Sequence, residues 1–356
     1  MRVKECGEFG FIDSIKEDTI VDPSTVTVGI GDDCAVYSAE PNREQLITTD
    51  MMVAGIHFSP KTTEPFDVGY RLGAANISDI AAMGGTPRQA VIAVALPDDM
   101  TVEYMHRLFD GLKSVCHKYG VNLIGGDTVK TDGSLVLSVT VIGDVPTGKA
   151  LLRSGAKPGD LVAVTGPVGS SAVGLGALLA GVDGYEVAKA IHKRPEPQVA
   201  WGLRLRHAGA HSANDISDGL ASELNEIAKA SGVVITIQAE NIPLLDETRQ
   251  WAKETNKDPL SFAYFGGEDF QLVTTVPAKA FQRGDLTGLH VIGHVTAGDE
   301  PVVYVETGEG FKTKLPAKGY NHFTEDKATD GKATALKTAT TATASTATKQ
   351  KEDSHE

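Results

Sequence analysis

The chain has 356 residues, of which 41% are hydrophobic and 22% charged, and its formal net charge is −14. This length predicts two domains with a sizeable core, and no apolar run approaches the roughly 18 residues of a membrane span. The negative charge disfavours nucleic-acid binding, which depends on Lys and Arg, and would also repel a small phosphorylated ligand unless Mg²⁺ intervenes.

Cysteine usage and the N-terminal sequence bear on location. Cys6, Cys34 and Cys116 are too few and too scattered for a disulfide framework or a cysteine-ligated zinc site. Residues 1–6 lack the apolar segment of a signal peptide. We therefore expect a cytoplasmic protein that binds neither membranes nor nucleic acid.

Two series of strand-like and helix-like patterns follow each other along the chain. The first predicts strands over residues 26–30, 46–49, 90–96 and 134–143 and helices over 67–83 and 102–119. The second predicts strands over 161–165, 233–238 and 271–276 and helices over 170–180, 197–207 and 219–230. This alternation predicts an α/β (α+β) protein with mixed sheets packed against helices.

The segment between the two series predicts a domain boundary. Residues 146–160 contain two prolines and three glycines, a composition typical of a connection. We place the boundary near residue 148, with an N-terminal domain over 1–147 and a C-terminal domain over 148–324. Residues 325–356 are low in complexity and predict a disordered tail.

Six short segments each offer an aspartate or glutamate from a turn or from the end of an element. They are residues 31–33 (GDD), 48–50 (TTD), 77–79 (ISD), 125–127 (GGD), 215–218 (DISD) and 266–269 (GGED). Apolar or glycine-rich sequence flanks nearly all of them, whereas a solvated acidic surface would interleave Lys, Ser and Gln. Carboxylates near a core need compensation, which hard divalent cations supply. The chain lacks a G-x-x-x-x-G-K-[ST] loop, so the set predicts a phosphate site with several magnesium ions.

Each motif also has a plainer interpretation. Asp32 and Asp33 follow turn glycines, where adjacent carboxylates repel each other unless a cation lies between them; the alternative is an ordinary turn. Residues 48–50 close a predicted strand and offer hydroxyl and carboxylate ligands, or merely cap it. Asp79 shares a helix face with small and apolar residues, which is a poor place for an uncompensated carboxylate.

The remaining motifs are equally open when taken singly. Residues 125–127 predict a strand end whose glycine N–H groups cradle a phosphate, or an incidental turn. Residues 215–218 precede a helix, where capping explains one carboxylate but not two. Arg153 could grip nucleotide phosphates, Tyr119 could stack on an adenine ring or pack in the core, and His57 lies in an apolar stretch.

Taken in order, these segments resemble the thiamine-monophosphate kinases, a family in the superfamily that includes aminoimidazole ribonucleotide synthetase. The resemblance runs from about residue 7 to residue 323. It rests on residues 29–36 (GIGDDCAV), 48–50 (TTD), 55–58 (GIHF), 76–84 (NISDIAAMG), 125–128 (GGDT), 153–160 (RSGAKPGD), 215–220 (DISDGL), 266–269 (GGED) and 318–323 (KGYNHF).

The resemblance implies a homodimer of two-domain subunits with the aminoimidazole ribonucleotide synthetase-like fold, in which the N-terminal domain binds ATP and several Mg²⁺ ions. The reaction would move the γ-phosphate of ATP to thiamine monophosphate. The acceptor phosphate, with a second pKa near 6, is mostly a dianion at neutral pH. We therefore expect neither a protein nucleophile nor a catalytic base.

Carried over position by position, the resemblance assigns roles to individual residues. The magnesium ligands would be Asp33, Thr48, Thr49, Asp50, Asp79, Asp127, Asp215 and Asp218. The ATP contacts would be Gly126, Asp127, Arg153 and Ser217, to which we add Tyr119. The contacts to thiamine monophosphate would be His57, Glu268 and Tyr320.

Two other classes of function stay open at this point. Selenophosphate, hydrogenase-maturation and aminoimidazole ribonucleotide synthetases share the superfamily, but residues 4–6 (KEC) and the C-terminal DSHE are poor matches to the reactive cysteines of the first two. A non-catalytic cation- or nucleotide-binding module would bind metal without producing ADP. One departure is visible: Phe270-Gln271 stands where the kinases usually have Tyr-Glu, which could change a contact near the substrate.

Overall fold

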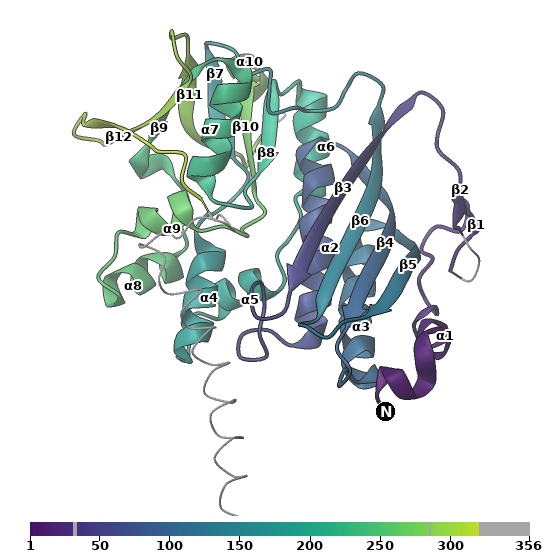
Figure 1. Cartoon of the computed structure of the whole chain (residues 1–356). Coiled ribbons are helices and arrows are strands. Elements are labelled where there is room, and N and C mark those ends of the chain that lie inside the picture. The colour runs from purple at the N-terminus through teal and green to yellow at the C-terminus, as the bar shows by residue number, and fades with distance from the viewer. Residues whose placement is uncertain (31–33, 285, 320–356) are drawn as a thin grey trace, which may run out of the picture.

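The computed structural model describes residues 1–30, 34–284 and 286–319. Within these residues the chain forms two parts, each built on one mixed sheet with helices packed against it (Figure 1). The α/β class with mixed sheets is therefore confirmed. None of the helices in the described ranges is long and apolar enough to cross a membrane.

The first part is built on a four-stranded sheet in the order β3-β6-β4-β5. The pairs β3–β6 and β6–β4 are antiparallel, and β4–β5 is parallel. Helices α2 and α3 pack behind this sheet, whose other face is turned toward the viewer in Figure 1. The elements are α1 (Val3–Ile15), β1 (Val26–Val28), β2 (Val36–Tyr37), β3 (Arg43–Val53), α2 (Pro65–Ala82), β4 (Thr86–Leu96), α3 (Val102–Tyr119), β5 (Asn122–Lys130) and β6 (Val136–Pro146).

The second part is built on a sheet in the order β13-β12-β9-β11-β7-β10-β8, in which only β12 and β9 pair in parallel among the described strands. Its elements are β7 (Asp160–Val164), α4 (Ser170–Ala180), α5 (Glu186–Lys193), α6 (Val199–Ala208), β8 (Ser212–Asp215), α7 (Leu220–Ser231), β9 (Val234–Gln238), η1 (Ala239–Asn241), α8 (Asp246–Glu254), α9 (Pro259–Phe265), β10 (Leu272–Pro277), α10 (Ala278–Gln282), β11 (His290–Thr296), β12 (Val302–Glu306) and β13 (Lys312–Lys314). The first sheet ends at Pro146 and the second begins at Asp160, so the boundary near residue 148 falls between them and stays a prediction.

Helix α2 lies between the two parts. Glycines at its contacts let α3 of the first part and α6 of the second approach it closely. A Cβ on Gly69 would come within 1.9 Å of the Leu108 carbonyl oxygen in α3, and one on Gly202 in α6 within 2.1 Å of the Ala81 oxygen. The helix is therefore buried along most of its length. Its polar residues can reach the first sheet on one side and the second part on the other.

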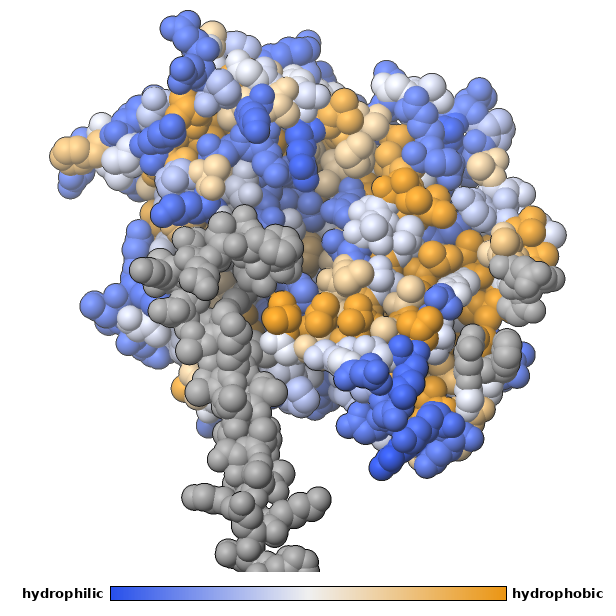
Figure 2. All heavy atoms as spheres, viewed as in Figure 1, coloured by the Kyte–Doolittle hydropathy of each residue, from blue (hydrophilic) through white to orange (hydrophobic). Residues whose placement is uncertain are grey.

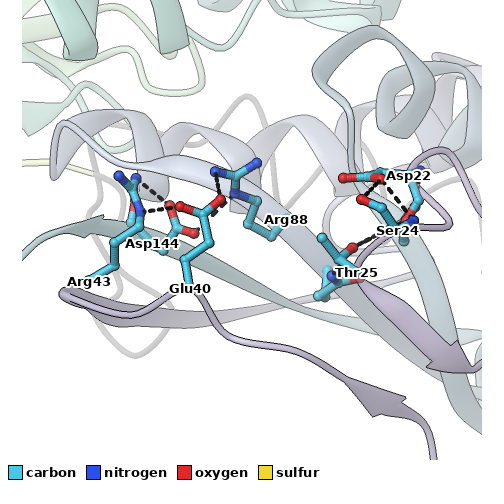
Figure 3. Close-up of polar contacts among 9 residues, drawn as sticks. Asp22, Ser24, Thr25, Glu40, Arg43, Arg88 and Asp144 are labelled. Carbon is cyan, nitrogen blue, oxygen red and sulfur yellow. Dashed lines mark hydrogen bonds and ion pairs between the residues drawn. The ribbon is translucent and has the colours of Figure 1, made fainter.

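Polar contacts tie the segment ahead of β3 to the first sheet (Figure 3). The buried Asp144 carboxylate in β6 accepts from Arg43 and, at 3.1 Å, from Nε of Arg88. Glu40 accepts from Nη2 of Arg88 at 3.2 Å. On the preceding stretch, the side-chain oxygen of Asn122 accepts from the main-chain N–H of Asp22 at 2.6 Å. These contacts hold the chain in place before and after residues 31–33. The predicted sites Asp32 and Asp33 lie outside the described residues.

Candidate functional site

Thr48, Asp50 and Asp79 come together where β3 faces α2. The sequence predicted a strand end at residues 48–50, which is wrong: β3 continues to Val53 because it pairs with β6 along its whole length. The two-residue period of a strand turns Thr48 and Asp50 to the same face. The Thr48 hydroxyl donates to Asp79, and the Asp50 main-chain N–H donates to Oδ1 of Asn76 at 3.0 Å.

The second part brings Asp215 and Asp218 to the same region. Asp215 is the last residue of β8 and is 4% exposed. The hydroxyl of Ser78, the neighbour of Asp79 in α2, donates to Oδ2 of Asp215 at 2.8 Å. The main-chain N–H of Asp218 donates to Oε1 of Glu223 in α7 at 3.0 Å. Consecutive residues of α2 therefore contact carboxylate-bearing strands of both parts.

Two acidic loops of the second part pair with each other along their main chains. The N–H of Ile216 donates to the Gln271 oxygen at 2.7 Å, and the N–H of Glu268 donates to the Ser217 oxygen at 2.7 Å. Glu268 has a φ of 66°, a conformation that non-glycine residues rarely adopt. Main-chain pairing thus continues beyond β8 and β10 into residues 215–218 and 266–269, but its register shifts, because Asp215 pairs with Leu272 whereas Ser217 accepts from Glu268.

Burial and mutual repulsion disfavour the charged forms of these carboxyls. Burial raises the pKa of Asp50 to about 6, helped by the charges of Asp79 and Asp218. Burial also raises the pKa of Asp79, although the Thr48 hydroxyl acts in the opposite direction. The pKa of Asp215 is raised by burial first and by the charge of Asp79 second. The site is therefore one that a cation would stabilise.

The carboxylates fit magnesium held partly by a phosphate. Within the described ranges, no three His, Cys, Asp or Glu side chains lie close enough together to hold a metal ion by themselves. Mg²⁺ is usually bound through one or two carboxylates together with waters and substrate phosphates. Asp50, Asp79, Asp215 and Asp218 supply such an incomplete set, so the metal roles predicted for them are compatible with the structure and stay predictions.

Of the predicted nucleotide contacts, Arg153 and Ser217 lie beside these acids. The guanidinium of Arg153 donates to Oδ1 of Asn214 at 3.1 Å, and its charge acts on Asp79 and Asp215 by opposing the rise in their pKa. Its side chain is 56% exposed, so part of the guanidinium faces solvent. Ser217 lies within the paired loops, one residue from Asp218.

Gly126, Asp127 and Thr49 lie elsewhere. β5 does not end at the glycines, as the sequence predicted, but continues to Lys130 beside β4. Asp127 in β5 pairs in register with Ala93 in β4. The Asp127 side chain lies on the sheet face away from α2, and β5 is the edge strand opposite β3. The Thr49 hydroxyl is on this face too, where it accepts from Thr140 at 3.0 Å. The fold of the chain therefore does not bring Asp127 or the Thr49 side chain together with Asp50 and Asp79.

Tyr119 is the last residue of α3, and its hydroxyl donates to Glu196 and, at 3.1 Å, to the Pro197 oxygen. Burial raises the pKa of this phenol well above its usual range, and the Glu196 carboxylate raises it further. The side chain is engaged with the connection between α5 and α6 rather than with Arg153 or Ser217. Its predicted stacking on adenine gains no support from these contacts.

His57 and Glu268, the predicted substrate contacts, share a neighbour. Nδ1 of His57 accepts from the Val53 N–H at 3.0 Å. Both the His57 oxygen and the Glu268 carboxylate face the guanidinium of Arg71, the latter at 3.4 Å. The structure therefore brings the two residues together. Tyr320 lies outside the described residues, but the preceding Gly319 is close to Asp218: a Cβ on it would come within 2.9 Å of the Asp218 oxygen.

Three buried polar residues of this region were not predicted. Arg71 is 1% exposed, His192 in α5 is 2% exposed, and Glu223 is 2% exposed with no partner for Oε2 among the described residues. Arg71 precedes Asp79 by eight residues on one helix, so a charge on the same face was a usable signal. His192 has no comparable signal, because it reaches the site only through packing of α5.

The departure at Phe270-Gln271 concerns a contact that supports the acidic loop. Oε1 of Gln271 accepts from the Thr165 hydroxyl at 2.8 Å, a role that a glutamate carboxylate fills equally well. Phe270 is 5% exposed and packs as an apolar residue. Neither side chain contributes a carboxylate to the acidic group, so the substitution alters a supporting contact only.

The raised pKa of Asp50 predicts how stability depends on pH without metal. Because the folded-state pKa of about 6 exceeds the ordinary 3.8, the ionised carboxyl destabilises the fold as pH rises through this window. Asp50→Asn should therefore leave stability unchanged at pH 4 and raise it by about 1–3 kcal/mol at pH 7. Denaturant unfolding with a chelator present measures both values. An equal difference at the two pH values would contradict the assignment.

Comparison with known proteins agrees with this fold. The family described as AIR synthase related protein matches with its N-terminal domain over residues 31–145 and with its C-terminal domain over residues 157–306. A thiamine-monophosphate kinase of Bacillus subtilis is 40% identical over 330 residues, covering 89% of this chain and 99% of that protein. The thiamine-monophosphate kinase structure from Stenotrophomonas maltophilia is 34% identical with a TM-score of 0.74, covering 84% of this chain and 96% of that one.

A structure of a relative with bound ligands is also similar. The complex of AaThiL with AMPPCP and TMP is 33% identical with a TM-score of 0.72, covering 91% of this chain and 99% of that one. The matches over both mixed-sheet parts place the chain in the AIR synthase-related class. Within that class the chain belongs to the thiamine-monophosphate kinase family, and is thus an ATP-dependent kinase. The family resemblance predicted from the motifs is confirmed.

Proposed function

We propose that this chain transfers the γ-phosphate of ATP to thiamine monophosphate, giving thiamine diphosphate and ADP. The observation that carries the proposal is the meeting of desolvated carboxylates from both parts, Asp50 and Asp79 from one and Asp215 and Asp218 from the other. Such a group has no structural benefit by itself, since burial of unpaired charge is costly. Its placement suits the joining of two polyanions through bound cations.

The chemistry requires positioning rather than a protein base. A terminal oxygen of the thiamine phosphate attacks the γ-phosphorus and forms the new P–O bond. The bond from that phosphorus to the bridging oxygen breaks, and ADP leaves with the electron pair. The attacking phosphate is already mostly a dianion, so no proton has to be removed. Bound Mg²⁺ would neutralise phosphate charge and align the two oxygens.

We assign the residues around this step as follows. Asp50, Asp79, Asp215 and Asp218 hold magnesium with the phosphates, and Arg153 and Ser217 contact the nucleotide. His57 and Glu268 face the thiamine side, where Glu268 supplies a negative charge for the cationic ring. Support for this division comes from the placement of Arg153 beside the acids and of Glu268 beside His57.

Transfer of label tests the proposal directly. ATP labelled in the γ-phosphate should yield labelled thiamine diphosphate when thiamine monophosphate and millimolar Mg²⁺ are present, and none when a chelator is added. The label should not be released as inorganic phosphate. Label found only as inorganic phosphate would mean that the chain hydrolyses ATP and does not use this acceptor.

We also propose a homodimer formed through the face of the first sheet that α2 does not cover. Ile47, Met51 and Val129 on this face are 73%, 56% and 51% exposed. Figure 2 shows apolar side chains gathered over this sheet. Such a dimer would bury these side chains and place Thr49 and Asp127 at the interface between subunits.

An added charge tests the dimer. Ile47→Glu should convert the protein to a monomer in sedimentation velocity, because a carboxylate would have to be buried at the interface. Val36→Glu is a matched control on the separate β1–β2 pair, since Val36 is 48% exposed. A wild-type monomer at micromolar concentration would contradict the proposal.

The cytoplasm stays our predicted location, in keeping with the three free cysteines.

A further inference from the structure

Arg71 is a charged side chain enclosed between the two parts of the molecule. It lies in the middle of α2 and is 1% exposed. Nη2 donates to the main-chain oxygen of His57 and approaches Oε1 of Glu268 at 3.4 Å, and Nη1 lies 3.1 Å from Nε2 of His192. One guanidinium thus contacts the loop after β3, the loop before β10 and helix α5. A buried charge with such defined partners needs a reason beyond stability.

The contact with Arg71 also fixes the proton on His192. Because a guanidinium only donates, Nε2 of His192 must accept, and the ring N–H is therefore on Nδ1. Nδ1 lies 3.0 Å from the Ser171 hydroxyl and 3.7 Å from Oε2 of Glu268. The Glu268 carboxylate consequently has the Arg71 guanidinium 3.4 Å from one oxygen, and the Nδ1 edge of the His192 ring lies 3.7 Å from the other, beyond hydrogen-bonding distance.

The chain around Glu268 is held at the same place. The buried Asp269 carboxylate accepts from the main-chain N–H of Gly169 and, at 2.9 Å, from that of Ser171 at the start of α4. Ser171 in turn contacts His192, so the contacts close into a ring through both parts. The Glu268 side chain nevertheless is 26% exposed. Its carboxylate is therefore oriented from the buried side while part of it stays accessible to a ligand.

We propose that Arg71 and His192 are positioning residues that hold the Glu268 carboxylate from two sides, so that it faces the cationic ring of thiamine monophosphate. The proposal rests on the proposed function and adds two residues that act on the thiamine side only. A carboxylate oriented in advance binds a cation without the entropic cost of ordering its side chain. Loss of either residue should therefore weaken binding of the acceptor and leave binding of ATP unchanged.

Steady-state kinetics with both substrates test this division. His192→Leu and Arg71→Lys should each raise the KM for thiamine monophosphate about tenfold or more, as expected for loss of a charge-assisted contact, while the KM for ATP stays within about twofold. His192→Asn keeps an amide N–H near the position of Nδ1 and should restore most of the affinity. His294→Leu, at an exposed histidine of β11, is the matched control. Calorimetric binding of thiamine monophosphate gives the same comparison without turnover.

A double-mutant cycle separates positioning from a general structural role. In the Glu268→Ala background, His192→Leu should change the KM for thiamine monophosphate little further, because its effect passes through the missing carboxylate. Effects that multiply independently, or a raised KM for ATP, would overturn the proposal. If His192→Leu does not fold, the cycle with Arg71→Lys decides by the same criterion. Turnover of the wild type tests the proposed function, whereas ratios of variant to wild type test this inference.

Discussion

Replacing Asp79 by asparagine should lower kcat for phosphate transfer by about 10²–10³-fold and leave the metal-free protein at least as stable as the wild type. Asp79 accepts from Thr48 and acts electrostatically on both Asp50 and Asp215. Asparagine keeps the shape and the acceptor for the Thr48 hydroxyl but removes the charge that would hold a cation. Stability does not fall, because burial already disfavours the ionised form and raises its pKa.

Steady-state turnover and thermal melting in a chelator measure the two effects on the same samples. Asp132→Asn is the matched control, because the Asp132 side chain is fully exposed, at 100%, and its ion pair with Lys130 is long at 3.7 Å. That variant should retain turnover within about twofold, as surface charges contribute little. An Asp79→Asn enzyme with near-wild-type turnover would show that this carboxylate holds no catalytic cation.

Replacing Gly267 by alanine should force the two acidic loops, residues 215–218 and 266–269, apart. A Cβ at this position would come within 2.1 Å of the Ser217 oxygen and 3.1 Å of the Asp218 Cα, which are main-chain atoms and cannot rotate away. Loops 215–218 and 266–269 would have to part, moving Asp218 and Glu268 together. We expect a stability loss of about 1–3 kcal/mol and a fall in kcat/KM of about 10²-fold, since small displacements of positioned groups are costly.

Denaturant unfolding and kinetics on Gly267→Ala provide both numbers. Gly133→Ala, in the connection between β5 and β6, is the matched control, because the nearest atom to its added Cβ is the Thr131 Oγ1 at 3.5 Å. Neither glycine has a positive φ, so the comparison isolates the steric contact from backbone strain. Unchanged activity in a destabilised Gly267→Ala protein would mean that the paired loops do not position the site.

Local signals predicted α2, α3, α4, α6 and α7, whereas α1, α5, α8, α9 and α10 were not predicted. α3 begins after Thr101, whose side chain accepts from the Tyr104 N–H, and ends before Gly120 with a φ of 70°. Such caps are local chemistry, and they fixed the bounds that the sequence predicted. Some strands were missed as well. β8 reads Ser-Ala-Asn-Asp and is buried throughout, because its place in the sheet beside β10 depends on partners distant in the sequence.

The candidate site was predictable as a set of residues but not as an arrangement. The acidic motifs indicated carboxylates near a core, and α2 does direct Asp79 toward β3. The sheet face that each motif occupies depended on pairing: β3 and β5 continue past the residues where the sequence predicted ends. Asp127 and Thr49 consequently lie on the face opposite Asp50. His192 could not be predicted, since it reaches Glu268 only through the packing of α5.

Release of ADP from ATP, measured with and without thiamine monophosphate at millimolar Mg²⁺, tests the central claim most directly. If desolvated carboxylates hold magnesium so that two phosphates can meet, ADP should form only when ATP, Mg²⁺ and thiamine monophosphate are all present, with one thiamine diphosphate per ADP. ADP formed at the same rate without the acceptor, or no ADP with all three present, would contradict the account.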